Sequence, residues 1–421
     1  MLDLFPDTST IEGDTLTVGG ASATALAKEF GTPLLVYCEQ TLRARARSYR
    51  SAAPEALVVY AAKAFPNVAL LRLFAGEGLG ADVSTLGELT FAHRAGVPPA
   101  RLVVHGNNKS DAELHAAVRG GAAFLVLDSL EEVGRAAAAG AGRVLVRVTP
   151  GIEAETHEAI RTAHLGSKFG LPADDAVETI AQARSANLDL TGLHIHLGSD
   201  LRDLNASRTA VDWLAAFATS CRAELDWTPA VIDLGGGLGV RTVPDDIVPA
   251  IDDYVRRLLE RVDAAWRLHE LPTPRLILEP GRSLVAAAGV TLYRVGVVKQ
   301  ASDAVTYVAV DGGMSDNPRP QLYGARHTAL LANRAAERAA GRFAVCGRHC
   351  EAGDVLMDSI ELPSPRRGDL LAVPATGAYT LAMGSNYNGV PRPAAVLVAG
   401  GRARLIRRRE TIDDLLGYEQ Q

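Results

Sequence analysis

Lys63 is the first residue of this sequence whose type and position suggest chemistry. It lies in the segment VVYAAKAFPN, at the end of an apolar, β-branched run that predicts a buried strand. A lysine in such a place is either an ion-pair partner or a reactive amine whose charge is reduced by desolvation and by cationic neighbours. A reactive amine of this kind can form a Schiff base with an aldehyde cofactor.

Two later segments contain groups that a phosphorylated ring cofactor would need. The triplet Gly235, Gly236 and Gly237, in VIDLGGGLGV, either lets backbone N–H groups approach a phosphate or only permits tight packing. Its spacing differs from the G-x-G-x-x-G of a dinucleotide-binding fold. Glu279, in LILEPGRS, could keep a pyridine nitrogen protonated, or it could pair with an arginine.

Two histidines occur in the segment GLHIHLGS. His196 ends the predicted strand and could lie flat against one face of such a ring. A single histidine inside a barrel is more often a satisfied core residue. We assign that structural role to His194, which lies two residues earlier.

Eight short apolar runs, separated by Ala-rich segments of helical period, would position these residues. After an opening LLVY (34–37), the runs are 57–63, 79–84, 101–106, 123–129, 143–150, 190–199, 231–237 and 276–282. Eight βα units without hairpin turns favour a closed parallel (β/α)8 barrel over an open doubly wound sheet.

Polar residues stand at the end of each run. They are Lys63, Asp82 with Ser84, His105 with Asn107, Asp128, Arg147, His196, the glycine triplet, and Glu279 with Arg282. The carboxyl ends of barrel strands meet at one mouth, where active sites are built, and a phosphate often binds after strands seven and eight. We therefore expect these residues to converge.

Beyond residue 283 the pattern changes to short strands punctuated by Gly, Pro and Asp, which predicts a mostly antiparallel β domain. One helical patch, HTALLANRAAERAAG (327–341), is expected to interrupt it. The predicted domains are a barrel over 34–283 and a β-rich domain formed by 1–33 with 284–421.

The composition excludes several classes of function. The 421 residues carry a net charge of −6 and scattered Lys and Arg, which does not favour nucleic acid or an anionic membrane surface. Apolar stretches of about eight residues are too short to span a bilayer, and the N-terminus lacks the features of a signal peptide. Four cysteines fit a reducing, cytoplasmic location. Cys346 and Cys350 lack a second pair of ligands, so no metal is expected.

Together the motifs resemble the alanine-racemase-type fold of pyridoxal 5'-phosphate (PLP) enzymes, fold type III, and in particular its ornithine, diaminopimelate and arginine decarboxylase family. The resemblance covers about residues 30 to 400, and the motifs come in the family's order. YAAKAFPN resembles the Schiff-base lysine motif. The cofactor-site blocks are resembled by GADVSTLGEL, HGNNKS, HIHLGS, DLGGGLG and EPGR. DGGMSDNPRPQLYGARH, CGRHCEAGD and TGAYTLAMGSNYNGVPRP resemble the substrate-site blocks.

The resemblance implies a role for each matching residue. Lys63 would form the Schiff base with PLP, His196 would stack on the ring, and Glu279 would pair with its nitrogen. The other implied cofactor contacts are Asp82, Ser199, Gly235, Gly236, Gly237, Gly281, Arg282 and Tyr379. Cys350 would donate a proton after CO2 leaves. In this family Cys350 and Glu351 would come from the partner subunit of a homodimer.

The residues expected at the far end of the substrate favour meso-2,6-diaminopimelate, which would yield L-lysine and CO2 in the last step of lysine biosynthesis. In this family, enzymes for diamine-type substrates bind the distal amine with an Asp that directly follows the tyrosine of the DGGMSDNPRPQLYGARH block. In this sequence Gly324 follows that tyrosine, Tyr323. A guanidinium group can instead receive a distal carboxylate in two parallel bonds, and Glu351 can take the distal amine. THEAIRTAHLGSKFG also resembles the diaminopimelate branch. The expected substrate contacts are Arg282, Arg319, Tyr323, Glu351 and Tyr379. The alternative for Arg319 is a surface salt bridge.

Three positions depart from the family pattern: Ala163, Asp200 and Ala352. Asp200 lies close to the implied cofactor site and leaves room for another substrate, for example in a secondary-metabolite pathway. The rival functions are decarboxylation of ornithine, lysine or a D-amino acid by the same residues, racemisation, and non-catalytic PLP binding. The CGRHCEAGD block disfavours a racemase, and the second domain disfavours a PLP carrier.

Overall fold

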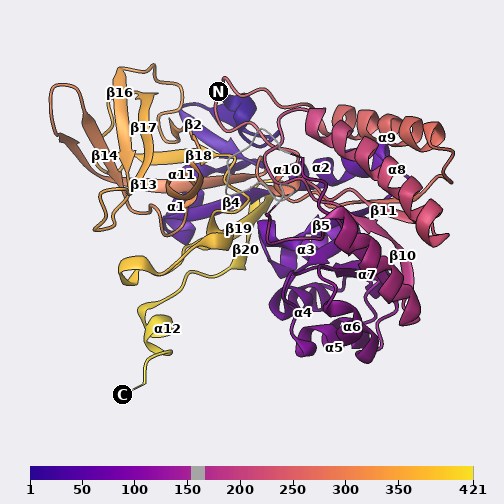
Figure 1. Ribbon diagram of the computed structural model, residues 1–421. Helices are drawn as coiled ribbons and strands as arrows, with labels where there is room; N and C mark the ends of the chain where they lie inside the picture. Colours follow the sequence, from indigo (N-terminus) through magenta and orange to yellow (C-terminus); the bar gives the residue numbers. More distant parts are fainter. Residues whose placement is uncertain (153–165, 421) are drawn as a thin grey trace. The chain divides into compact units, whose positions relative to one another are not determined.

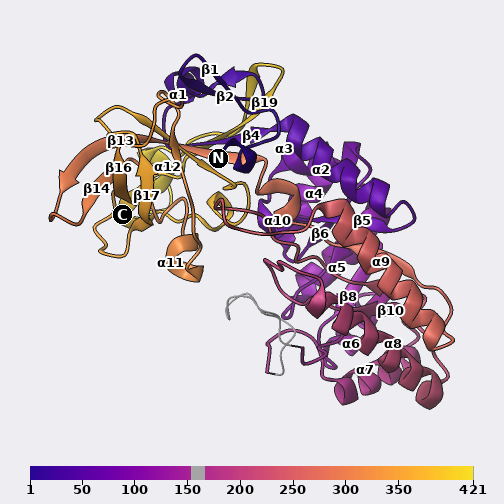
Figure 2. The same ribbon diagram turned by 90° about the horizontal axis from the view of Figure 1, so that it is seen from above.

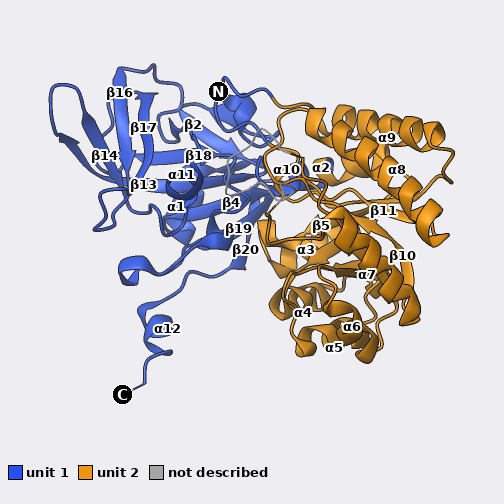
Figure 3. Ribbon diagram, in the orientation of Figure 1, with its two compact units in different colours: residues 1–44, 240–247, 284–421 blue, residues 45–239, 248–283 orange. Residues whose placement is uncertain are grey.

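The computed structural model describes residues 1–152 and 166–420, which divide into two compact units (Figure 3). The barrel unit comprises Arg45–Gly239 and Val248–Ser283. The β-rich unit comprises Met1–Ala44, Val240–Ile247 and Leu284–Gln421. Each unit has its own clusters of buried apolar side chains, so each builds a separate core.

Eight parallel strands close into a barrel in the order β10-β11-β12-β5-β6-β7-β8-β9. They are β5 (Leu57–Ala61), β6 (Gly80–Val83), β7 (Leu102–Val104), β8 (Phe124–Leu127), β9 (Arg143–Arg147), β10 (Asp189–His194), β11 (Val231–Asp233) and β12 (Arg275–Leu278). Each coincides with one of the eight runs recognised in the sequence, although β10 and β12 begin one residue before theirs, so the predicted barrel is confirmed. Nearly every residue of β5 to β8 is buried, as expected of strands covered on both faces.

Helices follow the strands and lie on the outside of the barrel in both views (Figures 1 and 2). Those after β5 to β11 are α3 (Val68–Gly76), α4 (Leu86–Ala95), α5 (Asp111–Arg119), α6 (Glu132–Ala138), α7 (Ala173–Ser185), α8 (Asn205–Leu225) and α9 (Ile251–Leu268), and α10 (Arg282–Val285) follows β12. Side chains at their starts fix several of them: Asn67 caps α3, Thr85 caps α4, and Ser110 forms a capping box with Glu113 at α5. No helix in the described ranges is long and apolar enough to cross a membrane.

The β-rich unit contains a nine-stranded sheet whose main path is β17-β16-β14-β13-β4-β19-β20, with β18 pairing β13 and β15. Its strands are β4 (Leu34–Cys38), β13 (Gly289–Gln300), β14 (Thr306–Val310), β15 (Leu330–Leu331), β16 (Gly341–Cys346), β17 (Val355–Leu362), β18 (Leu370–Pro374), β19 (Ala394–Ala399) and β20 (Arg402–Arg407). All pairs are antiparallel except β14 with β16 and β4 with β19. The mostly antiparallel character matches the sequence pattern.

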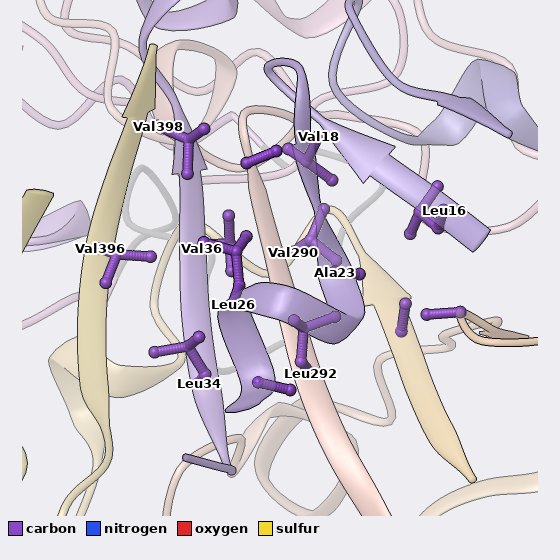
Figure 4. Close-up of a cluster of buried hydrophobic side chains, with 14 of the residues drawn as sticks. Leu16, Val18, Ala23, Leu26, Leu34, Val36, Val290, Leu292, Val396 and Val398 are labelled. Atoms are coloured by element: carbon purple, nitrogen blue, oxygen red, sulfur yellow. The ribbon is translucent and has the colours of Figure 1, made fainter. Parts of the chain in front are cut away.

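The N-terminal segment packs on this sheet. It forms β1 (Thr10–Glu12), β2 (Thr15–Val18), β3 (Ala21–Ser22) and α1 (Ala23–Phe30), and α2 (Glu39–Ala52) follows β4. Leu16, Val18 and Leu26 cluster with side chains of β4, β13 and β19 (Figure 4). These apolar contacts explain why the first residues belong to the β-rich unit.

The division into units differs from the sequence expectation at residues 34–44 and 240–247, which the structure places in the β-rich unit. We placed the start of the barrel domain at residue 34, but β4 pairs antiparallel with β13 and parallel with β19. All five β4 residues are buried. A buried apolar run of this kind fits a central strand of either a barrel or an open sheet, so composition alone could not assign it.

The helix predicted over 327–341 is wrong. The segment instead contains β15 and turns. Its backbone hydrogen bonds go to the sheet, since Ala332 N donates to Leu370 O at 2.6 Å. Arg334 and Asn333 also bond to the buried Asp369, at 2.9 and 3.0 Å. Tertiary pairing has overridden the helix propensity of the alanines.

Candidate functional site

The barrel brings together residues from the ends of several strands. Lys63, in a 3-10 turn after β5, has its Nζ 4.0 Å from Asp82 Oδ2 of β6. The other oxygen of Asp82 lies 3.6 Å from His105 Nε2, which follows β7. His105 Nε2 is 2.6 Å from Glu279 Oε1, which follows β12. The predicted convergence of strand ends therefore holds for these four residues.

The sequence allows Lys63 to be either an ion-pair partner or a desolvated, reactive amine. Its side chain is 44% exposed in the structure. The Asp82 carboxylate supplies an ion-pair partner. An exposed amine is still well placed to meet an incoming aldehyde.

Glu279 is a buried carboxylate surrounded by histidines. His105 and His194 approach its two oxygens at 2.6 and 3.4 Å. Burial alone would raise the pKa of Glu279, but interactions with His105 and, to a smaller extent, His194 hold it well below its ordinary value. The sequence left open a pairing of Glu279 with a barrel arginine. Arg147 instead lies 3.5 Å from Asp128.

Asp233, on β11, completes this buried cluster. Burial and the neighbouring Glu279 raise its pKa well above the ordinary value, and its Oδ1 accepts a hydrogen bond from Gly235 N at 2.9 Å. Burial lowers the pKa of His194 to about 3, so this histidine is neutral. The core role assigned to His194 agrees with its burial.

The donor atoms of this cluster lie within 4.8 Å of one another, a spacing that could also hold a metal ion. The direct 2.6 Å contact between His105 and Glu279 argues against one. Ligands of a tetrahedral ion with bonds of about 2.0–2.2 Å would be separated by more than roughly 3 Å. His105 and Glu279 bond directly to each other instead.

The glycine triplet forms a tight loop after β11, packed against the residues that follow β10 and β12. Gly235 and Gly237 have φ values of +64° and +114°, which favour glycine. A Cβ on Gly236 would lie 2.2 Å from Glu279 O, so no side chain fits there. Gly236 N donates to His196 Nδ1 at 3.3 Å, which ties the imidazole ring to the loop. Burial, Lys63 and Arg147 lower the pKa of His196 well below its ordinary value.

A cation lies beside this loop region. Arg282, buried at the start of α10 and preceded by the buried Gly281, donates from Nη2 and Nε to Ser199 Oγ at 2.8 and 3.2 Å. Its Nε is also 3.9 Å from Asp200 Oδ1. Asp200 adopts a left-handed φ of +66° and pairs with Arg202 at 3.4 Å. The carboxylate of Asp200 therefore partly offsets the charge of Arg282.

These residues fit PLP by their chemistry. An exposed amine, Lys63, can meet its aldehyde, and the ionised Glu279 can accept from its ring nitrogen. Closely packed glycines with a buried guanidinium and a hydroxyl group provide the donors of a phosphate site. All of them belong to the barrel unit.

In the β-rich unit, Cys350 and Glu351 are exposed on the loop between β16 and β17. The buried Asp354 holds that loop: Oδ2 accepts from His349 N and Nδ1 at 2.9 and 2.7 Å, and Oδ1 accepts from Met314 N at 2.7 Å. Cys350 N donates to Asn388 Oδ1 at 2.9 Å. The thiol is thus exposed while its backbone is fixed.

The other substrate-site candidates of this unit lie on and near a short helix. Arg319 begins α11 (Arg319–Tyr323) and is buried, so the surface salt bridge is excluded. Its guanidinium lies 5.6 Å from the centre of the Tyr323 ring, whose hydroxyl contacts Met383 Sδ at 3.9 Å. Tyr379 follows β18 and has a positive φ of +56°. Ala163 lies outside the described residues.

Sequence reasoning gave no role to His105, Asp233 or Asp354. His105 stood among the strand ends, and Asp233 and Asp354 lie beside the glycine triplet and Cys350 in motifs already recognised. Each of the three is a titratable residue inside a motif that resembles a cofactor-site or substrate-site block, and this position could have marked it as a candidate. Asp233 and Asp354 bond to nearby residues, but the partner of His105 is Glu279, 174 residues away.

Comparisons with known proteins agree with this chemistry. Residues 39–286 match the family model described as "Pyridoxal-dependent decarboxylase, pyridoxal binding domain". A diaminopimelate decarboxylase of Actinosynnema pretiosum is 45% identical, with 99% of this chain and 95% of that protein covered. One from Mycobacterium tuberculosis is 42% identical over 98% of this chain and 96% of its own. The crystal structure of a diaminopimelate decarboxylase from M. jannaschii with L-lysine is 31% identical, has a TM-score of 0.91, and covers 99% of this chain and 98% of its own.

Proposed function

This chain belongs to the family of pyridoxal-dependent decarboxylases, and we propose on that premise that it converts meso-2,6-diaminopimelate to L-lysine and CO2. The observation that carries the choice of substrate is the 45% identity, over nearly the whole chain, to a diaminopimelate decarboxylase. The buried Arg319 supports it, because a buried guanidinium suits a substrate with a second carboxylate.

The barrel unit holds the cofactor in this proposal. PLP, when bound, supplies a protonated ring that accepts the electron pair left by departing CO2. Lys63 provides the amine that binds its aldehyde, and Asp82 pairs with that amine. Glu279 accepts from the ring nitrogen, and His196 lies against the ring. Gly235, Gly236, Gly237, Gly281, Arg282 and Ser199 hold the phosphate, with Tyr379 from the β-rich unit.

The β-rich unit supplies the proton and reads the substrate. Cys350 donates a proton to the carbon that has lost CO2, and its exposed position on a fixed loop suits this task. Arg319 and Arg282 receive the distal carboxylate, and Glu351 receives the distal amine. Tyr323 and Tyr379 complete the contacts to the substrate.

The working form in this proposal is a homodimer with shared active sites, in which Cys350 and Glu351 serve the partner's Lys63. Exposure of both side chains on the single chain supports this arrangement. Mixing Lys63→Ala with Cys350→Ala subunits tests it, since each heterodimer would contain one intact site. Recovery of about a quarter of wild-type activity is expected at random mixing, and no recovery would rule out shared sites. Four free cysteines suit a cytoplasmic enzyme.

The deciding experiment compares substrates. Purified protein with added PLP is assayed for CO2 release from meso-diaminopimelate, ornithine, lysine and arginine. We expect kcat/KM for diaminopimelate to exceed the others by roughly 10⁴-fold, because a buried cation left unpaired rejects substrates that lack its partner. Preference for ornithine or lysine would overturn the assignment. Asp200, beside Arg282, is the feature that favours such an altered preference.

A further inference from the structure

Glu279 faces charged or titratable groups from five other strands. His105, His194, Asp233, Asp82 and Arg147 surround it, from β7, β10, β11, β6 and β9. Of these, His105 makes the shortest contact, at 2.6 Å. The His194 Nε2 distance is 3.4 Å, and the two rings pack edge to face with centres 4.7 Å apart.

The backbone that presents His105 is fixed by its own motif. His105 N donates to Val83 O at 2.8 Å. In HGNNKS the lysine turns back, and Lys109 Nζ donates to Gly106 O at 2.5 Å and to Val126 O at 2.8 Å. Lys109 is itself buried and paired with Glu132 at 2.8 Å. The imidazole is therefore aimed at Glu279 by a rigid, self-bonded turn.

A buried carboxylate favours protonation unless donors compensate its charge. A protonated Glu279 would carry no negative charge, so a pyridinium N–H would lose its charged partner. Asp233, whose pKa is raised, adds no positive charge, and His194 is neutral. Of the two histidines, His105 lies within ordinary hydrogen-bond distance of Glu279, at 2.6 Å, whereas His194 Nε2 lies 3.4 Å away.

We propose that His105 is a positioning residue for the reaction: its Nε2–H orients Glu279 and keeps it ionised for the ring nitrogen of the cofactor. This role rests on the proposed function, since it requires a pyridine ring opposite Glu279. The same imidazole lies 3.6 Å from Asp82, which pairs with Lys63, so His105 links the two carboxylates that serve opposite ends of the cofactor.

The test compares His105→Leu, which removes the donor, with His105→Gln, whose amide can replace it. In the holoenzyme, His105→Leu should lower kcat roughly 10- to 100-fold, the range for losing a hydrogen bond to a charged group, with little change in KM. The pH dependence of the bound cofactor's visible absorbance should also shift. His105→Gln should restore most of both. His115→Gln, on the exposed face of α5, is the matched control.

A second readout uses the protein without PLP. Because Glu279 has a lowered pKa, its stabilising contribution is present above its unfolded pKa and fades as the pH falls. The Tm deficit of His105→Leu should therefore be constant above about pH 4.5, the ordinary pKa of a glutamate, and shrink as the pH falls from there toward about pH 3. A lost packing contact would give the same deficit at both pH values.

The outcomes separate the two proposals. An equal Tm deficit at both pH values, with an unchanged absorbance profile, would overturn the role of His105. If wild-type protein decarboxylated none of the four amino acids yet the Tm deficit varied with pH as expected, the proposed function would fail, and the pairing of His105 with Glu279 would be supported. Failure of His105→Gln to restore kcat would overturn the hydrogen-bond explanation.

Discussion

In the barrel unit, Lys63, His105 and Glu279 follow strands β5, β7 and β12. Lys63 pairs with Asp82 of β6, and His105 bonds to Glu279. In the β-rich unit, Cys350 and Glu351 lie exposed on a loop. That loop is fixed through backbone N–H groups, while its reactive side chains remain accessible. In the barrel unit the charges are compensated by neighbouring side chains. In the β-rich unit the thiol and the carboxylate are accessible to solvent and to a binding molecule.

This difference separates two kinds of task. Buried, mutually bonded groups create a fixed electrostatic environment, which suits a cofactor that stays bound through every turnover. Exposed groups on an anchored loop suit a reactant that comes and goes. Substitutions in the barrel unit should therefore alter the absorbance of the bound cofactor. Substitutions in the β-rich unit should alter only turnover or substrate choice.

The largest effect is expected from Lys63→Ala. Removing the amine should abolish turnover and the visible absorbance of lysine-bound PLP. The Tm without PLP should hardly change, because the side chain is 44% exposed. Lys63→Arg keeps the charge beside Asp82 and serves as the control for the ion pair. Turnover by either variant would contradict the role of Lys63.

Cys350→Ala should lower kcat by roughly 10²–10⁴-fold, the usual contribution of a general acid. The absorbance of bound PLP should stay unchanged, because the thiol belongs to the β-rich unit and not to the barrel. Cys346→Ala, four residues earlier on β16, is the matched control. A loss of cofactor absorbance in Cys350→Ala would break the proposed separation of tasks.

Arg319→Lys should change substrate choice and leave the cofactor alone. The ammonium keeps the charge but loses the planar fork, so KM for diaminopimelate should rise roughly 10- to 100-fold. The slow reaction with lysine, which lacks the distal carboxylate, should not weaken. Arg326→Lys, exposed just beyond α11, is the control. An equal loss of activity with diaminopimelate and with lysine would show that Arg319 acts on folding or on the amino-acid end that both substrates share.

The barrel could be predicted because each strand is a short apolar run and because topology brings strand ends together. Lys63, His105 and Glu279 are brought together in this way, although they are far apart in the sequence. The β-rich unit offered less. Its sheet joins β4 and β13, more than 250 residues apart, through pairings that no local pattern encodes.

The failures have specific physical causes. The segment 327–341 has helix-forming alanines, but Asn333 and Arg334 bond to Asp369, and the backbone of β15 pairs with β18. The exposure of Lys63 could not be read from its strand, because the chain turns sharply at Ala62–Ala64. The partner of a buried charge depends on three-dimensional contacts, so the role of His105 required the structure.

Asp354→Asn tests whether the loop must be anchored. An amide presents N–H groups where one carboxylate oxygen now accepts two bonds from His349, so the free energy of unfolding should fall by about 1–3 kcal/mol. kcat should fall less than in Cys350→Ala, with the cofactor absorbance unchanged. Asp358→Asn, exposed on β17, is the control. Normal stability in Asp354→Asn would show that the loop is held by other contacts.

The smallest effect concerns pH and the β-rich unit alone. Burial raises the pKa of Asp316 from 3.8 to about 7, although bonds from Tyr293 and Gly313 oppose the shift. A raised pKa stabilises the fold below the unfolded value, and this contribution is lost as the pH rises from about 4 to about 7. Asp316→Asn cannot ionise, so its Tm should decline less than that of wild type over this range, while Asp303→Asn, exposed before β14, should follow wild type. Parallel curves for Asp316→Asn and wild type would mean that Asp316 is already ionised in the folded unit. Because its partners Tyr293 and Gly313 belong to the β-rich unit, PLP should leave this slope unchanged, whereas it should alter any slope that arises from Glu279.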